Sequence, residues 1–371
     1  MGYVGKTQML AHGVAVAAIP VFEEVFEFLL RQHCIFLRHD RSTSYRQQAC
    51  HQSIKDSCRA PHASVPPALN ASRHNRLCSR LESSRNRQIR RQIRNTHMDS
   101  FQDRTALVTG ASSGIGLALA HELAKRGAHL ILSARSGDKL DALAREIRAS
   151  GREAAVFTAD LSESGSAKKL YDEINAAGLQ VDLLVNNAGY GRWGDFLSFE
   201  SEDYQRMIHL NISSLTELCH LAIPDMVARG GGGVVNVGST ASFVPVPFSA
   251  VYGATKGYVI MLTEAIRYEY AGKGVRVMTL CPGATASNFA HVASENSSEE
   301  LKNLNAKMEK SNNMGQTCEE VAIEGLDAFL RDKVCAITGR SNRMTMFLPR
   351  ILSRKRSLKM VGDIFRRRTA N

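Results

Sequence analysis

The chain has 371 residues, and its 47 Lys and Arg against 36 Asp and Glu give it a net charge of +11. Its eight cysteines show no C-x-x-C spacing, which argues against a disulfide framework or a metal site and is typical of a reducing compartment. We therefore expect a cytoplasmic protein without a bound metal.

Residues 1–97 differ in composition from the rest of the chain. They hold 15 Lys and Arg against 6 Asp and Glu, so nine of the net positive charges lie here. Residues 41–97 are rich in Arg, Ser, His and Gln, which indicates disorder, and charged residues interrupt the more apolar residues 9–37. We predict a basic, disordered leader. It could be a transit-like segment or an interaction arm, but we favour a misassigned start ahead of Met98.

The first apolar run, residues 105–109, leads into Thr109-Gly-Ala-Ser-Ser-Gly-Ile-Gly116 and then into an amphipathic segment. A strand, a glycine-rich turn and a helix in this order are typical of dinucleotide binding. Small residues let backbone N–H groups approach a pyrophosphate at the positive helix N-terminus, although an ordinary βα turn is the alternative. The candidate cofactor-binding residues here are Gly110, Ser112, Ser113, Gly114, Ile115 and Gly116.

The second apolar run, residues 129–133, ends where an NAD-binding unit has the acidic residue that binds the ribose. Neither Asp nor Glu stands there, but Arg135 does. An arginine at this point suits a 2′-phosphate, so we expect NADP(H) rather than NAD(H). A solvated loop charge is the alternative reading of Arg135.

Polar residues follow three later apolar runs. Asp160 and Leu161 end the run that starts at residue 154, where a side chain could reach an adenine. Asn186 begins the segment Asn-Asn-Ala-Gly, and Ser239 ends the run that starts at residue 234. The predicted cofactor-binding residues in these segments are Asp160, Leu161, Asn187, Ala188 and Gly189.

Tyr252 and Lys256 lie four residues apart in a segment that we predict to be helical, so both belong to one helix face. An ammonium group stabilises a nearby phenolate, and we expect the pKa of Tyr252 to fall from near 10 toward working pH. Such a tyrosine can pass a proton to or from a carbinol oxygen, which accelerates a reaction about 10²–10⁴-fold. The pair alone is a weak signal, but Ser239 precedes Tyr252 by thirteen residues.

Taken in order, these motifs resemble those of the short-chain dehydrogenase/reductase family over about residues 101–340. The resemblance implies that Tyr252 is the general acid/base, that Lys256 lowers its pKa and holds the nicotinamide ribose, and that Ser239 polarises the substrate carbonyl. It also implies that Asn211 anchors a water-linked proton relay. The matching segment after the next apolar run is Cys281-Pro282-Gly283, and the further cofactor contacts implied are Tyr252, Lys256, Pro282 and Gly283.

The alternation of apolar runs and helix-period segments predicts an α/β fold. Near-continuous Val, Ile and Leu strands indicate a parallel sheet that is covered on both faces. We expect a single doubly wound Rossmann domain of three αβα layers at residues 98–345. The expected strands are 105–109, 129–133, 154–159, 181–185, 234–238, 275–280 and 334–338. The expected helices are 116–126, 139–149, 167–176, 204–228, 251–270 and 319–330.

Two further segments bear on the substrate and on partners. Residues 288–313 are polar and helix-compatible, at the position where the family has its variable substrate lid. Residues 346–371 form a basic amphipathic tail, which could contact an anionic membrane surface, a second subunit or its own domain. Apolar residues beside the motifs could line a lipophilic pocket or pack in the core; they are Tyr190, Trp193, Phe243, Val244, Pro245, Val246 and Phe248.

The predicted function is an NADP(H)-dependent oxidoreductase that interconverts a carbonyl and a secondary alcohol, with a small to medium lipophilic substrate. The alternative is a non-catalytic NADP(H)-binding regulator on the same fold. The intact set of Ser239, Tyr252 and Lys256 favours the enzyme, because a binding protein does not need all three. We expect a homo-oligomer. We do not expect it to bind nucleic acid, because no zinc spacing or RNA-binding signature is present.

Overall fold

The computed structural model describes residues 98–286, 315–351 and 353–370. The predicted leader at 1–97 and the predicted lid at 288–313 therefore lie outside the described residues. The domain boundaries drawn from the sequence, the homo-oligomer and the cytoplasmic location stay predictions.

Seven parallel strands form one sheet in the order β3-β2-β1-β4-β5-β6-β7. The chain runs outward from β1 to β3 and then returns to the middle at β4, which creates a switch point between β1 and β4. This is the doubly wound α/β domain expected from the sequence. The strands are β1 (Thr105–Thr109), β2 (His129–Ala134), β3 (Ala154–Thr158), β4 (Leu183–Asn186), β5 (Gly232–Val237), β6 (Val275–Cys281) and β7 (Cys335–Ile337).

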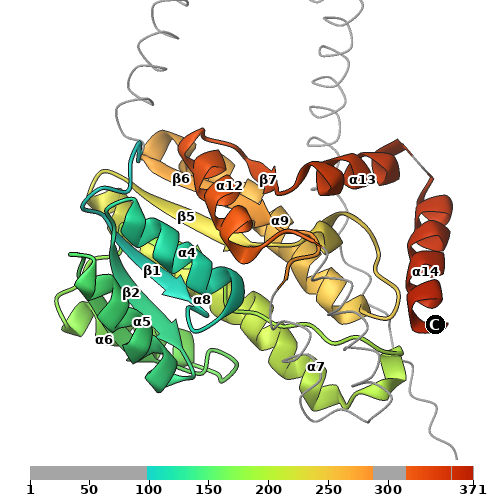
Figure 1. Ribbon diagram of the computed structural model, residues 1–371, viewed down its shortest axis with the longest axis horizontal. Coiled ribbons are helices and arrows are strands. Elements are labelled where there is room, and N and C mark those ends of the chain that lie inside the picture. The colour runs from blue at the N-terminus through green and yellow to red at the C-terminus, as the bar shows by residue number, and fades with distance from the viewer. Residues whose placement is uncertain (1–97, 287–314, 352, 371) are drawn as a thin grey trace, which may run out of the picture. The chain divides into compact units, whose positions relative to one another are not determined.

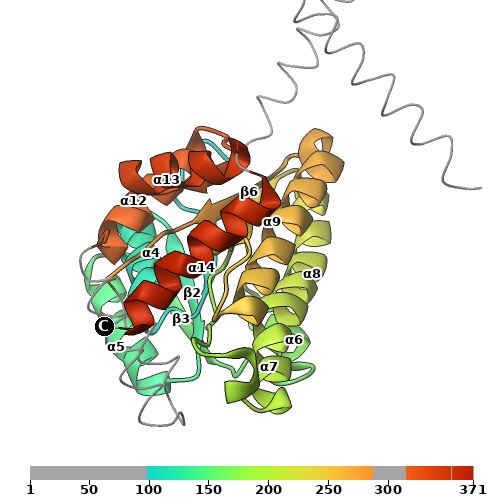
Figure 2. The same ribbon diagram turned by 90° about the vertical axis from the view of Figure 1, so that its right-hand side faces the viewer.

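Helices cover both faces of the sheet, as Figure 2 shows from the side. Successive strand residues point to opposite faces, so Leu107 and Val108 of β1 belong to two different hydrophobic clusters. One layer contains α4 (Gly114–Lys125), α5 (Gly137–Ala149) and α12 (Cys318–Leu330). The other contains α6 (Ser166–Ala176), α8 (Leu215–Ala228) and α9 (Ala250–Tyr270).

The helix predicted at 204–228 consists of three segments. α7 (Ser201–Ile208) continues into a π-helical stretch, η3 (His209–Ser214), and then into α8. π-helical turns are rare and occur frequently at functional sites. Short 3₁₀ turns are η2 (Phe196–Ser198), η4 (Thr240–Phe243) and η5 (Ala271–Lys273).

The end of the chain forms two helices, α13 (Arg340–Ile351) and α14 (Arg354–Ala370), where the sequence suggested a single tail from 346. The boundary drawn at 345 thus lies inside α13. Within the described ranges, no helix is long and apolar enough to span a membrane.

Candidate active site

The glycine turn after β1 has the backbone that its sequence requires. Gly110 and Gly114 have φ of 67° and 58°, in the left-handed region that favours glycine. A Cβ at Gly116 would collide with the carbonyl oxygen of Gly110 and with the Asn187 side chain. The first turn of α4 can therefore lie close to the strand, with its N-terminal N–H groups beside the end of the sheet (Figure 1).

Asn187 holds this turn in place from the neighbouring strand end. Its Nδ2 donates to the carbonyl oxygens of Thr109 at 3.0 Å and Gly110 at 3.3 Å. The backbone N–H groups of Asn187 and Ala188 both donate to Thr109 Oγ1 at 3.1 Å. The side-chain amide of Asn187, a predicted cofactor contact, is thus engaged in shaping the glycine turn.

Arg135 follows the end of β2 with an exposed side chain. Burial raises the pKa of Asp160, but hydrogen bonds from Ser162 and the charges of Arg135 and Arg206 outweigh it, so the net pKa lies below its ordinary value. The positive charge of Arg135 thus favours the carboxylate of Asp160, the other predicted cofactor residue at these strand ends. The side chain of Leu161, in contrast, is buried in the hydrophobic cluster on the α6 side, so it packs in the core.

Ser239, Tyr252 and Lys256 come together between the end of β5 and the start of α9. Tyr252 and Lys256 are 8% and 5% exposed. Lys256 Nζ lies 5.9 Å from the centroid of the Tyr252 ring and donates to the carbonyl oxygen of Val237 at 2.8 Å. A hydrogen bond joins the side chains of Ser239 and Tyr252. Serine and tyrosine hydroxyls side by side can together bind one carbonyl or carbinol oxygen.

The protonation states differ from the expectation for Tyr252. Burial raises its pKa to about 12; the hydrogen bond to Ser239 lowers it, and nearby Cys281 raises it further. Burial also lowers the pKa of Lys256 to about 8. The expected fall in the pKa of Tyr252 is therefore wrong for this structure, because burial disfavours both charged forms.

Asn211 lies in the π-helical stretch η3 and is 1% exposed. Its Oδ1 accepts from the Tyr190 N–H at 3.2 Å, and its Nδ2 donates to the Tyr190 carbonyl oxygen at 2.9 Å. A Cβ built on Gly189 would lie 2.9 Å from Asn211 Oδ1 and 3.4 Å from Lys256 Nζ. The glycine therefore leaves a small gap between the predicted relay residue and the lysine; the relay itself stays a prediction.

Two hydroxyl groups outside the predicted site residues support this site. Thr255 accepts from Asn211 Nδ2 at 3.0 Å and donates to the carbonyl oxygen of Tyr252 at 2.8 Å, so it ties η3 to α9. Ser242 accepts from the backbone N–H of Ser239 at 3.2 Å in a capping box that starts η4. Thr255 lies one turn after Tyr252 on a buried helix face that also holds Lys256 and Thr263, so its hydroxyl gave no distinctive signal in the sequence.

Gly283 follows β6 and lies against the Asn342 side chain of α13. A Cβ on this glycine would collide with that side chain. The carbonyl oxygen of the preceding residue, Pro282, accepts from the N–H of Thr240 at 2.8 Å. Both predicted cofactor residues thus lie beside the turn that follows Ser239.

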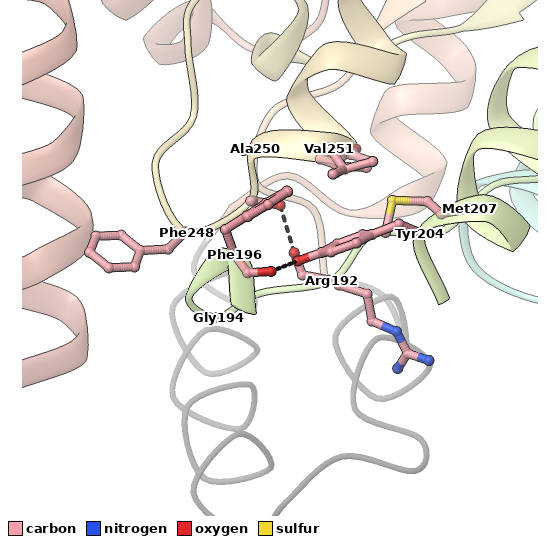
Figure 3. Close-up of a pocket in the computed structure, with 10 residues that line it drawn as sticks. Arg192, Gly194, Phe196, Tyr204, Met207, Phe248, Ala250 and Val251 are labelled. Atoms are coloured by element: carbon pink, nitrogen blue, oxygen red, sulfur yellow. Dashed lines mark hydrogen bonds between the residues drawn. The ribbon is translucent and has the colours of Figure 1, made fainter. Parts of the chain in front are cut away.

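A small cavity of about 30 Å³ adjoins Tyr252 on the substrate side (Figure 3). Two hydrogen bonds connect residues that line this cavity. Tyr204 Oη donates to the Phe196 carbonyl oxygen at 2.8 Å, and Ser249 Oγ donates to the Arg192 carbonyl oxygen at 2.8 Å. The lining residues are Arg192, Gly194, Phe196, Tyr204, Met207, Phe248, Ser249, Ala250, Val251 and Tyr252.

Of the residues proposed for the substrate side, Trp193 lies next to Tyr252 and Phe248 lines the same cavity. The ring of Trp193 lies 6.3 Å from the Tyr252 ring, centroid to centroid. Phe248 has a φ of 64°, which is uncommon for a bulky residue, and its ring is directed away from the other labelled side chains in Figure 3. Val246 instead is buried against Gly253 of α9.

Comparison with known proteins agrees with this geometry. A family model described as short chain dehydrogenase matches residues 104–298. The oxidoreductase UcpA of Escherichia coli K12 is 32% identical over 248 residues, which cover 66% of this chain and 94% of that protein. The human very-long-chain 3-oxoacyl-CoA reductase is 34% identical over 200 residues, which cover 50% of this chain and 61% of that protein.

Solved structures show the same likeness. A short-chain dehydrogenase from Sphingobium yanoikuyae in complex with NADPH is 30% identical with a TM-score of 0.57, covering 66% of this chain and 92% of that one. A short-chain dehydrogenase/reductase from Burkholderia phymatum in complex with NAD is 26% identical with a TM-score of 0.62, covering 68% and 94%.

The family match spans more than half of the chain, and the sheet order is that of a dinucleotide-binding fold. The residues matched by the family model thus run from before the glycine turn to beyond α9, the helix that contains Tyr252 and Lys256. The chain belongs to the short-chain dehydrogenase/reductase family and is an NAD(P)-dependent oxidoreductase that acts on CH–OH and C=O groups.

Proposed function

We propose that this oxidoreductase uses NADP(H) and interconverts a lipophilic carbonyl compound of small to medium size with its secondary alcohol. The observation that carries the cofactor preference is Arg135. It is exposed directly after β2, where an acidic residue would bind the ribose of NAD, and its charge acts on Asp160 across the strand ends. The related structures hold either NADPH or NAD, so the preference rests on this chain's own residues.

The catalytic groups divide the chemistry between them. A bound nicotinamide cofactor supplies the hydride chemistry. Ser239 donates a hydrogen bond to the substrate oxygen, which favours the charge that develops there. Tyr252 holds a proton at its Oη and delivers it to the same oxygen during carbonyl reduction. The buried Lys256 supplies a positive charge next to Tyr252 when it is protonated, and this charge favours the phenolate that remains.

The side chains near Tyr252 support a lipophilic substrate. Trp193 packs toward the Tyr252 ring, and Met207 and Val251 line the adjoining cavity. Apolar walls bind apolar groups in proportion to the area that they remove from water. Because the cavity measures only about 30 Å³, these side chains must move apart to admit a substrate.

The cofactor preference can be tested by direct binding. We expect Arg135→Ala to weaken NADPH binding by one to two decades, in line with about 1.5–3 kcal/mol for a charge-assisted hydrogen bond, and to leave NADH binding little changed. Lys139→Ala, an exposed lysine on α5, is the matched control and should change neither. Fluorescence titration of both cofactors measures the effect. Equal loss for both would make Arg135 structural, and a wild-type preference for NADH would refute the proposal.

The substrate class is tested with a panel of carbonyl compounds, assayed by oxidation of NADPH. We expect kcat/KM to rise with the apolar area beside the carbonyl until the cavity can open no further. Trp193→Ala should extend that limit to bulkier ketones. A panel in which only small hydrophilic carbonyls react would contradict the lipophilic assignment.

A further inference from the structure

Charge is unevenly distributed along this chain. Residues 98–339 hold 22 Lys and Arg against 29 Asp and Glu, so the catalytic part carries a net negative charge. From Arg340 to the end there are 10 Lys and Arg against one acid, Asp363. A basic segment next to an acidic body gives the molecule a preferred orientation toward any extended anionic surface.

α14 exposes five of these ten basic side chains. Its Ser357 and Val361, one turn apart, are 5% and 9% exposed, and an added Cβ on Gly362 would lie 3.5 Å from Pro247. This face of the helix therefore packs on the protein. Among the described side chains of the helix, the exposed basic ones are Arg354, Lys355, Arg356, Lys359 and Arg366.

α14 lies on the side of the molecule that contains the site. Figure 1 shows it beyond the ends toward which the strand arrows point, and in Figure 2 it crosses in front of them. Its neighbour Pro247 belongs to the segment between η4 and α9, and α13 packs against η4. The exposed basic face thus flanks the segment that connects Ser239 to Tyr252.

We propose that the exposed face of α14 is a docking surface for an anionic phospholipid membrane. Charge complementarity supports this, because each Lys or Arg near such a surface strengthens binding about fivefold. Two exposed apolar side chains favour a lipid surface over a purely ionic partner: Leu358, 46% exposed at the edge of the packed face of α14, and Met344, 77% exposed on α13. This surface is independent of the reaction and goes beyond the proposed function.

The test uses the full chain and sedimentation with vesicles of phosphatidylcholine alone or of phosphatidylcholine with phosphatidylserine. We expect binding to the anionic vesicles, which weakens as salt is raised. The triple variant Arg354→Gln, Lys355→Gln, Arg356→Gln should bind them roughly 100-fold more weakly, since three fivefold contributions are lost. The matched control removes three exposed charges elsewhere, Lys139→Gln, Arg145→Gln and Lys169→Gln, and should bind like wild type.

Turnover of a water-soluble carbonyl compound without vesicles should be equal in all three proteins, which shows that the folds are intact. If the triple variant were unstable, Lys359→Gln with Arg366→Gln provides a second test, with an expected loss of about 25-fold. Equal binding by wild type and the α14 variants would overturn the proposal, because the charge would then act from elsewhere in the chain. Selective binding of RNA without binding of anionic vesicles would overturn it as well.

Discussion

Replacing Lys256 by methionine should stabilise the cofactor-free protein while it destroys the site. Burial lowers the pKa of this lysine from 10.5 to about 8. At about 1.4 kcal/mol for each pKa unit, the buried charge opposes folding by about 3 kcal/mol. Methionine keeps the apolar stem, but it leaves the Val237 carbonyl oxygen without the hydrogen bond from Nζ, which costs about 1 kcal/mol. The net gain at pH 7 is about 2 kcal/mol.

The gain should depend on pH with a defined sign. The folded-state pKa of Lys256 lies below the unfolded value, so the unfavourable contribution is fully present below pH 8 and fades as the pH rises from about 8 to 10.5. Above that range only the lost hydrogen bond remains, and the variant should be less stable by about 1 kcal/mol. Burial raises the pKa of Tyr252 from 10.0 to about 12, so its unfolded form begins to ionise near pH 10, but this contribution is common to wild type and variant and cancels in their difference.

Urea unfolding of wild type and Lys256→Met at pH 7 and at pH 10 measures both effects. Lys125→Met is the matched control, because the side chain of Lys125 is 78% exposed on α4 and its charge is not buried. Turnover of Lys256→Met should be nearly abolished in the same preparations. A variant that is no more stable than wild type at pH 7, or whose advantage does not shrink at pH 10, would refute the reasoning.

Three other outcomes are expected. Tyr252→Phe should reduce kcat by about 10²–10⁴ while NADPH binds nearly as before, because only the ionisable hydroxyl is lost; turnover near the wild-type level would remove its role as acid/base. Thr255→Val should lower the free energy of unfolding by about 1–3 kcal/mol, since it leaves Asn211 Nδ2 buried without this partner, whereas Thr255→Ser should restore it. Deleting residues 1–97 should leave the melting temperature and NADPH binding nearly unchanged, because the chain from Met98 keeps the predicted domain whole; a loss of several degrees would show that the leader packs on it.

The sheet was predictable because its strands are buried on both faces. Strands such as β1 and β6 consist almost entirely of buried residues, so each produced a largely apolar run in the sequence, interrupted in β6 by the buried Arg276 and Thr279. The meeting of the motifs at one place was also predictable, because parallel strands bring their carboxyl ends to the same edge of the sheet. Gly110 and Ser239, more than a hundred residues apart, are both found at such ends.

The break in the helix predicted at 204–228 was not predictable from periodicity. Apolar side chains continue at helical spacing through Met207, Leu215 and Leu218, all of which are buried. The π-helical stretch between them changes the backbone hydrogen bonds, and its buried residues are the polar Asn211 and Ser214. Its consequence is local: Asn211 faces Thr255 and the backbone of Tyr190, so only the tertiary contacts reveal why the stretch exists.

The pKa of Tyr252 shows the limit of a spacing argument most clearly. A separation of four residues brought Lys256 to the same side of α9, as expected, but spacing does not report how deeply a pair is buried. Burial raises the pKa of the phenol to about 12 and lowers that of the ammonium to about 8, so at pH 7 the tyrosine is neutral while the lysine still carries its charge. A tyrosine that keeps its proton is the form that donates to a carbonyl oxygen. Tyr252 can therefore deliver its proton in this state, and the neighbouring Lys256 charge favours the phenolate that remains.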